Sequence, residues 1–361
     1  MAPSDLLHAH PAARFWRCPP APSEVRAFHA GLPGYAPTPL TEIAALAVEL
    51  GVGRVFVKDE SARLGLPAFK VLGASWAVDR ILAGRPDGEP VRLVAATDGN
   101  HGRAVARTAR LRGQRAHVVV PDWVHPVAVA AIADEGAEVT ESTGDYDAAV
   151  RRAAQLATEP GSVLVQDTAW PGYEQIPGWV VEGYSTLFGE VDEQLAAAGA
   201  APAGLVVVPV GVGSLAQAAV AHQRSGGGAA VLGVEPTTAA CLLAALAAGH
   251  PVTVATTTTI MAGLNCPTVS ELAWPVLRDG LDAAVAVTDD ETGAAAADLH
   301  DLGVPAGPCG AASLAGARSA LAAHPRRRDA LAEVGVDDGA TVVLLSTEGS
   351  AANPVLVSGP S

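Results

Sequence analysis

Lysine is the rarest charged residue of this chain, and its rarity singles out two positions for chemistry. The 361-residue sequence has 23 basic side chains, yet only Lys58 and Lys70 are lysine. Only a lysine amine can lose its proton and form an imine, so both are candidates for a task that arginine cannot perform; the alternative is survival by chance in an arginine-rich sequence. Lys58 precedes Asp59 and Glu60, which predicts a salt bridge. Lys70 opens a helix whose first turn is small enough for a planar ligand, so we predict that Lys70 forms the imine.

A second candidate site follows the predicted strand at residues 91–96, in the segment Thr97-Asp98-Gly99-Asn100-His101-Gly102. Two glycines and a helix start leave backbone N–H groups free, and the helix dipole favours a carboxylate or phosphate there. An ordinary turn capped by Asp98 or Asn100 is the alternative, although four adjacent polar side chains exceed what capping requires. The segment therefore indicates an anion-binding loop.

A third loop, Pro209-Val210-Gly211-Val212-Gly213-Ser214-Leu215-Ala216, follows an apolar strand at residues 205–208. It fits a phosphate cradle built from backbone N–H groups. It also fits the dinucleotide fingerprint G-x-G-x-x-A, with Glu235 where a ribose-binding acid would lie. An NAD(P)-dependent dehydrogenase is therefore a rival interpretation.

The fourth candidate is the apolar run at residues 342–350, which ends in the hydroxyls of Ser346 and Thr347. A terminal strand closed by a turn is the plain alternative. Together, the four segments require a cofactor with a phosphate, an aldehyde for a lysine and a ring that is polar at its edge. Pyridoxal 5'-phosphate has all three, whereas a dinucleotide explains only the third loop.

Alternating strands and helices must position these loops. Short β-branched runs alternate with alanine-rich segments of helical length, which is typical of parallel sheets covered by helices on both faces. Ligands of such sheets lie beyond the carboxyl ends of strands, where the candidate loops fall. Residues 11–39, rich in proline and glycine, predict an irregular arm. The predicted strands are 54–58, 91–96, 116–120, 163–166, 205–209, 231–235, 284–287 and 342–346.

Composition excludes several classes of protein. With 49% hydrophobic and 17% charged residues, no long apolar run and no leader-like start, we expect no membrane span, secretory signal or global disorder. A formal charge of −15 and short basic runs argue against nucleic-acid binding. Widely spaced cysteines without Cys-x-x-Cys predict no metal site and no disulfide framework, and hence a cytoplasmic protein. They are Cys18, Cys241, Cys266 and Cys309.

The sequence resembles the fold type II pyridoxal-phosphate enzymes, the superfamily of tryptophan synthase β and threonine dehydratase. Within that group it is most similar to the diaminopropionate ammonia-lyases. The general marks are Phe69-Lys-Val-Leu-Gly73 and Gly99-Asn-His101, and the specific ones are Asp98 and Gln166-Asp-Thr-Ala-Trp170. The resemblance covers nearly the whole chain. It implies a homodimer whose subunits hold the cofactor between a large domain of residues 1–74 and 184–361 and a small domain of residues 75–183.

The resemblance also implies a role for each candidate residue. Lys70 would bind the cofactor as an imine, and Asp98 and Asp167 would be the two acid–base carboxylates. Asn100 would contact the ring hydroxyl, and Thr347 would face the pyridine nitrogen. We predict a neutral hydroxyl at that nitrogen, from Thr347 or from its neighbour Ser346. The phosphate would be bound by Gly211, Val212, Gly213, Ser214 and Leu215. The substrate side would be formed by Thr97, Gly99, His101 and Tyr146.

The implied activity is the α,β-elimination of 2,3-diaminopropionate to pyruvate and ammonia by a carbon–nitrogen lyase. An acid such as Asp98 suits this substrate, because a second ammonium group entering a low-dielectric cleft needs a negative partner. Ala74 and Ser350 depart from the family pattern, which leaves a β-replacement synthase or a hydroxy-amino-acid dehydratase with the same cofactor as alternatives. Cys241 and Cys266 match a cysteine pair of the family, so a disulfide between them stays open.

Overall fold

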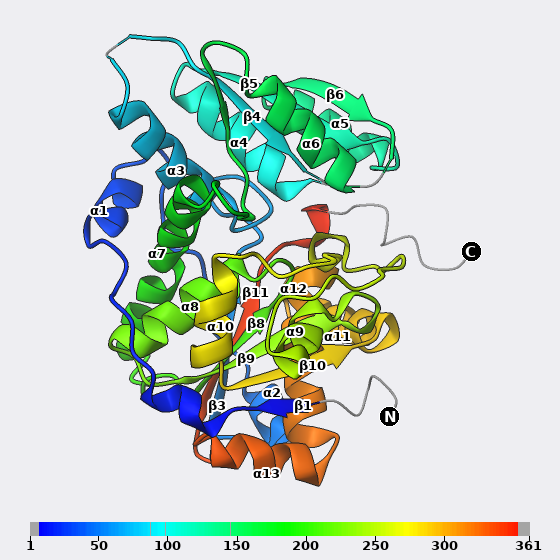
Figure 1. The fold of residues 1–361 in the computed structure, drawn as a ribbon. Helices are drawn as coiled ribbons and strands as arrows, with labels where there is room; N and C mark the ends of the chain where they lie inside the picture. Colours follow the sequence, from blue (N-terminus) through cyan, green and yellow to red (C-terminus); the bar gives the residue numbers. More distant parts are fainter. Residues whose placement is uncertain (1–6, 87, 98, 145, 353–361) are drawn as a thin grey trace.

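The chain folds into two bodies, each built around its own sheet (Figure 1). The computed structural model describes residues 7–86, 88–97, 99–144 and 146–352. Helices α3 (Val71–Ala83) and α7 (Gln175–Ala197) lie at the junction of the two bodies, and α3 packs along α7. The expected α/β fold with parallel-rich sheets covered by helices is confirmed.

The larger sheet has seven strands in the order β1-β10-β9-β8-β11-β3-β2. Its inner strands are parallel, and β1 and β2 pair antiparallel at the two edges. Leu344 of the central strand β11 lies beside Val57 of β3 and Val207 of β8, all fully buried. The strands are β1 (Leu7–Ala9), β2 (Leu40–Glu42), β3 (Arg54–Asp59), β8 (Leu205–Pro209), β9 (Ala230–Pro236), β10 (Ala283–Val287) and β11 (Thr341–Ser346).

Alternate residues of each strand serve the two faces of this sheet. In β3, Val55 and Val57 pack into the cluster of α2, α11, α12 and α13, whereas Phe56 packs into the cluster of α7, α8, α9 and α10. Both faces are apolar, which explains why these strands are continuous hydrophobic runs. The helices are α2 (Ala44–Leu50), α8 (Ser214–Ser225), α9 (Cys241–Ala248), α10 (Ala273–Gly280), α11 (Asp289–Asp301), α12 (Pro308–Ala317) and α13 (Pro325–Glu333).

The smaller sheet has four parallel strands in the order β6-β5-β4-β7. Leu93 and Ala95 of β4 pack against α3 and α4, while Val94 and Ala96 pack against α6 on the other face. The strands are β4 (Arg92–Ala96), β5 (Arg115–Pro121), β6 (Glu138–Ser142) and β7 (Ser162–Leu164), and the helices are α4 (Asn100–Leu111), α5 (Pro126–Ala133) and α6 (Tyr146–Leu156).

Two glycines bring α3 and α7 together backbone to backbone. A Cβ atom on Gly73 would lie 2.7 Å from the Val180 carbonyl oxygen, and one on Gly183 would lie 2.5 Å from the Leu72 carbonyl oxygen. Neither position has room for a side chain. The first turn of α3, which follows Lys70 directly, is therefore held tightly against α7.

The N-terminal arm differs from its prediction. Instead of irregular chain, residues 11–39 contain a 3₁₀ turn at Pro11–Phe15 and helix α1 (Glu24–Ala30). Val25 and His29 of α1 are fully buried. His29 binds the Thr186 hydroxyl through Nδ1 at 2.6 Å and donates from Nε2 to the Leu72 carbonyl at 2.9 Å. These tertiary contacts of α1 with α3 and α7 outweigh the helix-breaking composition of the arm.

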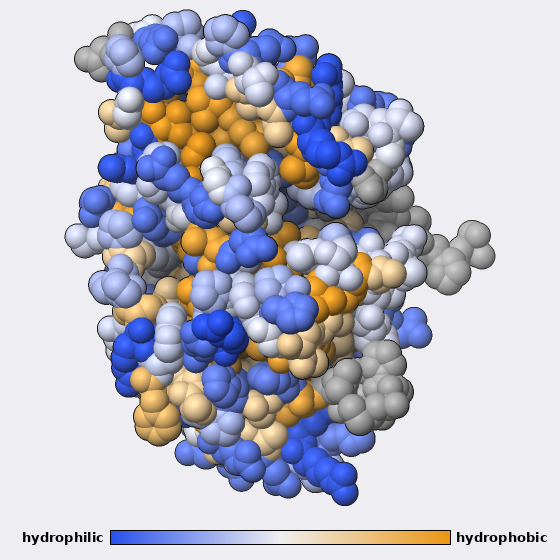
Figure 2. All heavy atoms as spheres, viewed as in Figure 1, coloured by the Kyte–Doolittle hydropathy of each residue, from blue (hydrophilic) through white to orange (hydrophobic). Residues whose placement is uncertain are grey.

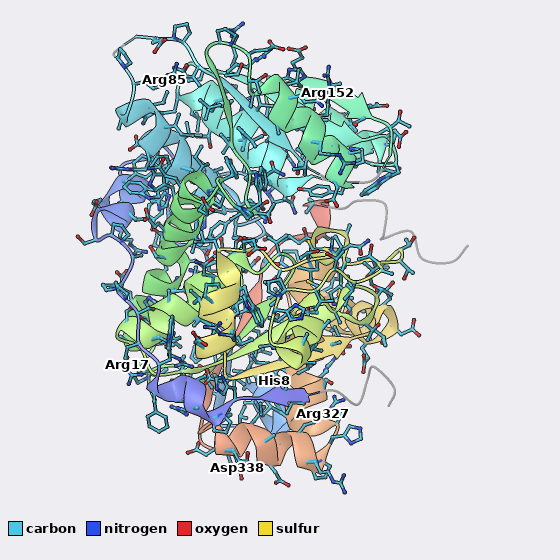
Figure 3. All side chains as sticks on the ribbon, in the orientation of Figure 1. His8, Arg17, Arg85, Arg152, Arg327 and Asp338 are labelled. Carbon is cyan, nitrogen blue, oxygen red and sulfur yellow. The ribbon has the colours of Figure 1, made fainter. Side chains whose placement is uncertain are left out.

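Mostly polar groups cover the face seen in Figure 2, with an apolar area on the upper body. Arg85 and Arg152 lie on the upper body, and Arg327 and Asp338 lie near the opposite end of the molecule (Figure 3). Within the described ranges, no helix is both long and apolar enough to cross a membrane. The same residues include no cluster of three or more histidine, cysteine, aspartate or glutamate side chains placed to hold a metal ion.

Candidate active site

Lys70 and Asp167 meet at the junction of the two sheets. Lys70 precedes α3, Asp167 follows β7, and Lys70 Nζ donates to Asp167 Oδ2 at 2.5 Å. Burial alone would lower the pKa of Lys70, but the charge of Asp167 outweighs burial and raises that pKa above its usual range. Burial would raise the pKa of Asp167, but the Lys70 ammonium holds that pKa well below its usual range. The two groups thus form a charged pair, with 21% and 10% of their side chains exposed.

His101 joins this pair from the first turn of α4. Its Nε2 donates to the Val165 carbonyl at 2.8 Å, which leaves Nδ1 as the acceptor nitrogen of a neutral ring. Nδ1 lies 3.8 Å from Asp167 Oδ2 and has no hydrogen-bond partner among the described residues. Burial lowers the pKa of His101, although Asp167 partly opposes the change. A buried, unused acceptor thus faces the same space as the Asp167 carboxylate.

The loop after β4 is described except for Asp98, which lies outside the described residues. The Thr97 hydroxyl accepts a hydrogen bond from Gly99 N at 3.0 Å. Asn100 Nδ2 donates to Glu348 Oε2 at 2.6 Å, so this loop meets the loop after β11. The structure therefore brings the second and fourth predicted segments together.

Tyr146 lies at the carboxyl end of β4, and its hydroxyl is held there by Gln166, a residue to which the sequence alone assigned no role. Gln166 is fully buried, and its Nε2 donates to the Tyr146 hydroxyl at 3.1 Å and to the Ala96 carbonyl at 3.0 Å. Gln166 Oε1 accepts Ala96 N at 3.0 Å. Its side chain fixes the residue before Asp167 to the end of β4. Gln166 lies in the family-like block of residues 166–170, and this was the available signal.

The glycine loop between β8 and α8 has the shape of a phosphate cradle. Gly213 adopts a φ of 97°, and a Cβ atom there would meet Leu277 Cδ1 at 2.8 Å. A Cβ atom on Gly211 would meet Cys266 Sγ at 3.1 Å. Val212 lies between these glycines, and Ser214 and Leu215 start α8, whose first N–H groups and positive dipole end suit an anion.

Ser346 and Thr347, at the end of β11, are both buried. Ser346 Oγ has no hydrogen-bond partner among the described residues, and a Cβ atom on Gly310 would lie 2.8 Å from it. An unsatisfied buried hydroxyl points to a polar ligand group, because an unpaired polar atom is costly to bury. The cradle and this hydroxyl fit the phosphate and the polar ring edge of pyridoxal phosphate.

Tyr184 of α7 is a second buried hydroxyl that the sequence analysis missed. Its ring centroid lies 4.8 Å from that of Phe69, and its hydroxyl has no partner among the described residues. Burial raises the pKa of Tyr184, and the positive charge of Lys70 partly opposes this. No motif surrounds Tyr184, so only the apolar helix in which it stands could have drawn attention to it.

Lys58 forms a salt bridge, as predicted, but with a different partner. Its fully buried Nζ donates to Glu190 Oε2 at 2.6 Å, to the Thr38 carbonyl at 2.8 Å and to Gln194 Oε1 at 2.8 Å. The bridge is made with α7 rather than with the adjacent acids. Lys58 is committed to this network, which leaves Lys70 as the lysine near the candidate loops.

Glu235 is placed differently from a ribose-binding acid. Its carboxylate is fully buried and accepts Leu242 N at 2.6 Å and Leu243 N at 2.9 Å in the first turn of α9. Burial raises the pKa of Glu235 to about 8. This geometry removes the feature that favoured the dinucleotide interpretation. The structure gives all four cysteines as thiols, and Cys241 Sγ donates to the Gly211 carbonyl at 3.7 Å.

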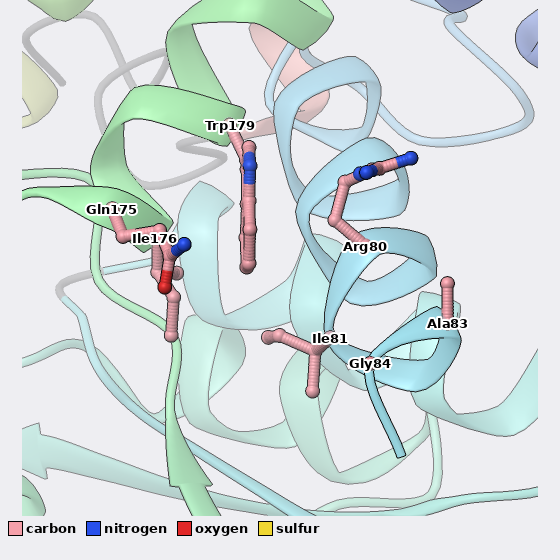
Figure 4. Close-up of a pocket in the computed structure, with 7 residues that line it drawn as sticks. All are labelled: Arg80, Ile81, Ala83, Gly84, Gln175, Ile176 and Trp179. Carbon is pink, nitrogen blue, oxygen red and sulfur yellow. The ribbon is translucent and has the colours of Figure 1, made fainter.

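A surface groove between the end of α3 and the start of α7 lies apart from these residues (Figure 4). Trp179 stands across from Ile81 in it, while Arg80 directs its guanidinium away from Trp179. Lys70 and Asp167 do not line the groove, so it is not the candidate active site. The lining residues are Arg80, Ile81, Ala83, Gly84, Gln175, Ile176 and Trp179.

Comparison with known proteins identifies the family of the chain. Residues 32–337 match the family described as "Pyridoxal-phosphate dependent enzyme". The diaminopropionate ammonia-lyases of Salmonella typhimurium strain LT2 and Escherichia coli strain K12 are 37% and 35% identical to the chain. The alignments cover 90% of this chain and 88% and 87% of the relatives.

A solved structure shows the same fold. The crystal structure of the Escherichia coli diaminopropionate ammonia lyase with an aminoacrylate-PLP azomethine reaction intermediate superposes with a TM-score of 0.85. The two sequences are 32% identical, and the superposition covers 96% of this chain and 94% of the Escherichia coli chain. The resemblance inferred from the sequence is confirmed. Because the family match and the relatives both span most of its length, the chain belongs to the pyridoxal-phosphate dependent enzymes.

Proposed function

We propose that this chain is a lyase that eliminates ammonia from 2,3-diaminopropionate and yields pyruvate. Relatives and solved structures of that name match nearly the whole chain. The observation that carries the proposal is the contact of Lys70 Nζ with Asp167 Oδ2 at 2.5 Å. The Asp167 carbonyl also accepts a hydrogen bond from Ser214 of the glycine loop, which would bind the phosphate. A lysine, a carboxylate and an anion site together are what an amino acid elimination needs.

The cofactor would be held by residues from both bodies. The backbone of residues 211–215 would bind its phosphate, Lys70 its aldehyde and Asn100 its ring hydroxyl. Ser346 or Thr347 would face the pyridine nitrogen, and the unpartnered Ser346 hydroxyl favours Ser346. When bound, pyridoxal phosphate supplies an electron sink for the carbon that loses a proton.

Asp167 would act as one acid–base carboxylate. It lies at hydrogen-bond distance from the Lys70 amine, so a substrate amine that takes this place meets an ionised carboxylate. The Lys70 ammonium depresses the pKa of Asp167, so the carboxylate is ionised; without that charge beside it, the carboxylate would become a stronger base, which suits it to accept a proton from the substrate. His101, with its acceptor Nδ1 beside Asp167, would accept a hydrogen bond on the same side.

Asp98 would be the second carboxylate, facing the opposite side of the substrate. Its neighbours Thr97 and Gly99 belong to the loop that Asn100 links to Glu348. A negative group here would balance the second ammonium of diaminopropionate, which a hydroxy amino acid lacks. Tyr146, held by Gln166, would close the substrate side beside this loop.

We further propose a small domain of residues 75–183 and a large domain of residues 1–74 and 184–361. The small sheet, at residues 92–164, falls inside the first of these. A cytoplasmic homodimer is the proposed form of the enzyme. Sedimentation of the purified protein at several concentrations measures the state of association.

Product analysis tests the proposed activity. The purified protein should carry a visible imine absorbance that borohydride removes. With 2,3-diaminopropionate it should release two molecules of ammonia for each pyruvate, whereas a hydroxy amino acid releases one. Added thiols should leave the pyruvate yield unchanged. Incorporation of the nucleophile into a new amino acid would instead identify a β-replacement synthase, and turnover of serine alone would identify a dehydratase.

A further inference from the structure

Hydrogen bonds fasten the segment around Asp167 to the glycine loop. The Ser214 hydroxyl donates to the Asp167 carbonyl at 2.6 Å. Two residues further on, Ala169 N donates to Ser270 Oγ at 3.0 Å, and Ser270 N donates in turn to the Val212 carbonyl at 2.9 Å. The loop suited to phosphate and the segment that carries Asp167 are therefore connected both directly and through Ser270.

Ser270 uses its polar groups on three different elements. Its N–H binds the glycine loop, and its carbonyl accepts Ala273 N and Trp274 N at 3.0 Å each in the first turn of α10. Its hydroxyl binds the segment after β7 through Ala169 N. Only 2% of its surface is exposed, and a rotation of its side chain would break the buried bond to Ala169 N. Ser270 is thus a rigid junction.

The hydroxyl of Ser270 is the part of this junction that matters for Asp167. Ala169 is 5% exposed, so its N–H is cut off from solvent and depends on Ser270 Oγ. The other bond at this point, from Glu271 N to the Ala169 carbonyl, is longer at 3.3 Å. Removing the hydroxyl would leave a buried donor unpaired, which favours movement of the chain toward water.

We propose that Ser270 is a positioning residue for Asp167. It transmits the fixed geometry of the phosphate cradle to the Asp167 segment and so sets where the carboxylate lies relative to Lys70. The proposal rests on the proposed acid–base role of Asp167. Ser214 makes the other connection, but it belongs to the cradle itself, so a change there would also alter phosphate binding.

Amide hydrogen exchange of the holoenzyme tests the junction without any turnover. Ser270→Ala removes one oxygen and keeps the backbone bond to Val212. We expect exchange of residues 166–173 to become about tenfold faster, because one net hydrogen bond is lost. Ser319→Ala is the matched control, since Ser319 is also a buried serine and its hydroxyl accepts a bond from Arg327 rather than from residues 166–173. It should leave residues 166–173 unchanged, and equal exchange in wild type and Ser270→Ala would overturn the proposal.

Kinetics with the two enantiomers of 2,3-diaminopropionate separates positioning from general damage. For the enantiomer that depends on Asp167, Ser270→Ala should lower kcat about tenfold with KM and cofactor Kd within about twofold. For the other enantiomer, Ser270→Ala should leave kcat unchanged. Ser270→Thr, which retains the hydroxyl, should keep the wild-type kcat for the enantiomer that depends on Asp167. Equal losses for both enantiomers would contradict a role that acts through Asp167.

The two proposals fail in different ways. If the wild type turns over neither enantiomer, the proposed function is wrong, and the exchange experiment still decides whether Ser270 fixes the segment. If the alanine variant does not fold, Ser270→Cys makes the same test, because a thiol of similar size is a weaker acceptor. Amides of residues 166–173 in Ser270→Cys should exchange faster than those of the wild type, and an unchanged rate would count against a positioning role of Ser270.

Discussion

Asn100 donates a hydrogen bond from Nδ2 to Glu348 Oε2 at 2.6 Å and so joins the loop after β4 to the loop after β11. Glu348 is 2% exposed, and its Oε1 also accepts Cys309 N at 3.3 Å. The carboxylate therefore fixes the amide that we place at the cofactor ring. A bond to a charged group contributes about 1.5–3 kcal/mol, so we expect Glu348→Ala to raise the Kd of pyridoxal phosphate at least about tenfold. Absorbance titration of the apoenzyme measures this constant.

The control for that experiment is Glu348→Gln, which retains an acceptor oxygen of the same reach. Its Kd should lie between those of the wild type and the alanine variant. An unchanged Kd in Glu348→Ala would show that the bond does not serve the cofactor.

The two lysines should respond in opposite ways to substitution. Borohydride reduction followed by peptide mapping should place the cofactor label on Lys70, and Lys70→Ala should lose both turnover and the imine absorbance. Lys58→Met should instead destabilise the fold by about 3–5 kcal/mol, because it leaves Glu190 short of a buried partner. Urea unfolding measures that loss, and a label found on Lys58 would refute the assignment.

The two carboxylates should divide the enantiomers of 2,3-diaminopropionate. Asp98→Asn should abolish turnover of the D-isomer and spare much of the L-isomer, and Asp167→Asn should do the reverse. A positioned base contributes about 10² to 10⁴ in rate, so each loss should be large. Assays of both pure isomers with both variants decide the matter. Equal losses on the two isomers would mean one shared base, and Lys70 would be the first candidate.

A neutral hydroxyl at the pyridine nitrogen should make the ring a weaker electron sink than an aspartate would. Thr347→Asp or Ser346→Asp, whichever residue faces that nitrogen, should slow elimination and shift the visible absorbance during turnover. The orphaned Ser346 hydroxyl leads us to expect the larger effect at Ser346. Stopped-flow spectra of both variants make the comparison, and unchanged rates and spectra at both positions would rule out this placement.

His29 should make the fold sensitive to acid. Burial lowers the pKa of His29 to about 4, and its bond to the Leu72 carbonyl only partly opposes this. Between about 4 and 6.5, the unfolded chain binds the proton more tightly, so the free energy of unfolding falls as the pH falls. We expect a loss of about 2 kcal/mol from His29 between pH 7 and pH 5. Urea unfolding at both pH values measures this loss of stability, and His29→Gln should remove most of it. An identical loss in that variant would show that His29 is not its cause.

The alternation of strands and helices could be predicted because each buried strand is a local pattern of β-branched residues. The loops after β4, β8 and β11 could be predicted as candidate sites from this alternation, since the parallel strands of a sheet end at the same edge. Local pattern failed for helix α1, where a proline- and glycine-rich arm gains its order from contacts of Val25 and His29 with distant helices.

Partners far apart in the sequence could not be predicted. Lys58 is paired with Glu190 rather than with the acids beside it, because the fold brings α7 to β3. Tyr184 and Ser270 belong to no sequence motif, and their importance comes only from burial and from the hydrogen bonds that they make or lack. Gln166 lies in the family-like block, but its bonds to Tyr146 and Ala96 are seen only in the structure. Asp167 was found through family resemblance, and nothing in its own surroundings marks it as the partner of Lys70.

The backbone contacts of Gly73 with α7 and of Gly183 with α3 also limit how far the helix after Lys70 can move. Two helices that touch through their backbones have no side chains between them to rearrange, so α3 cannot roll on α7. The backbone of Lys70, directly before α3, is therefore held in a rigid position. The loop after β4 is held differently, through the side-chain hydrogen bond from Asn100 to Glu348.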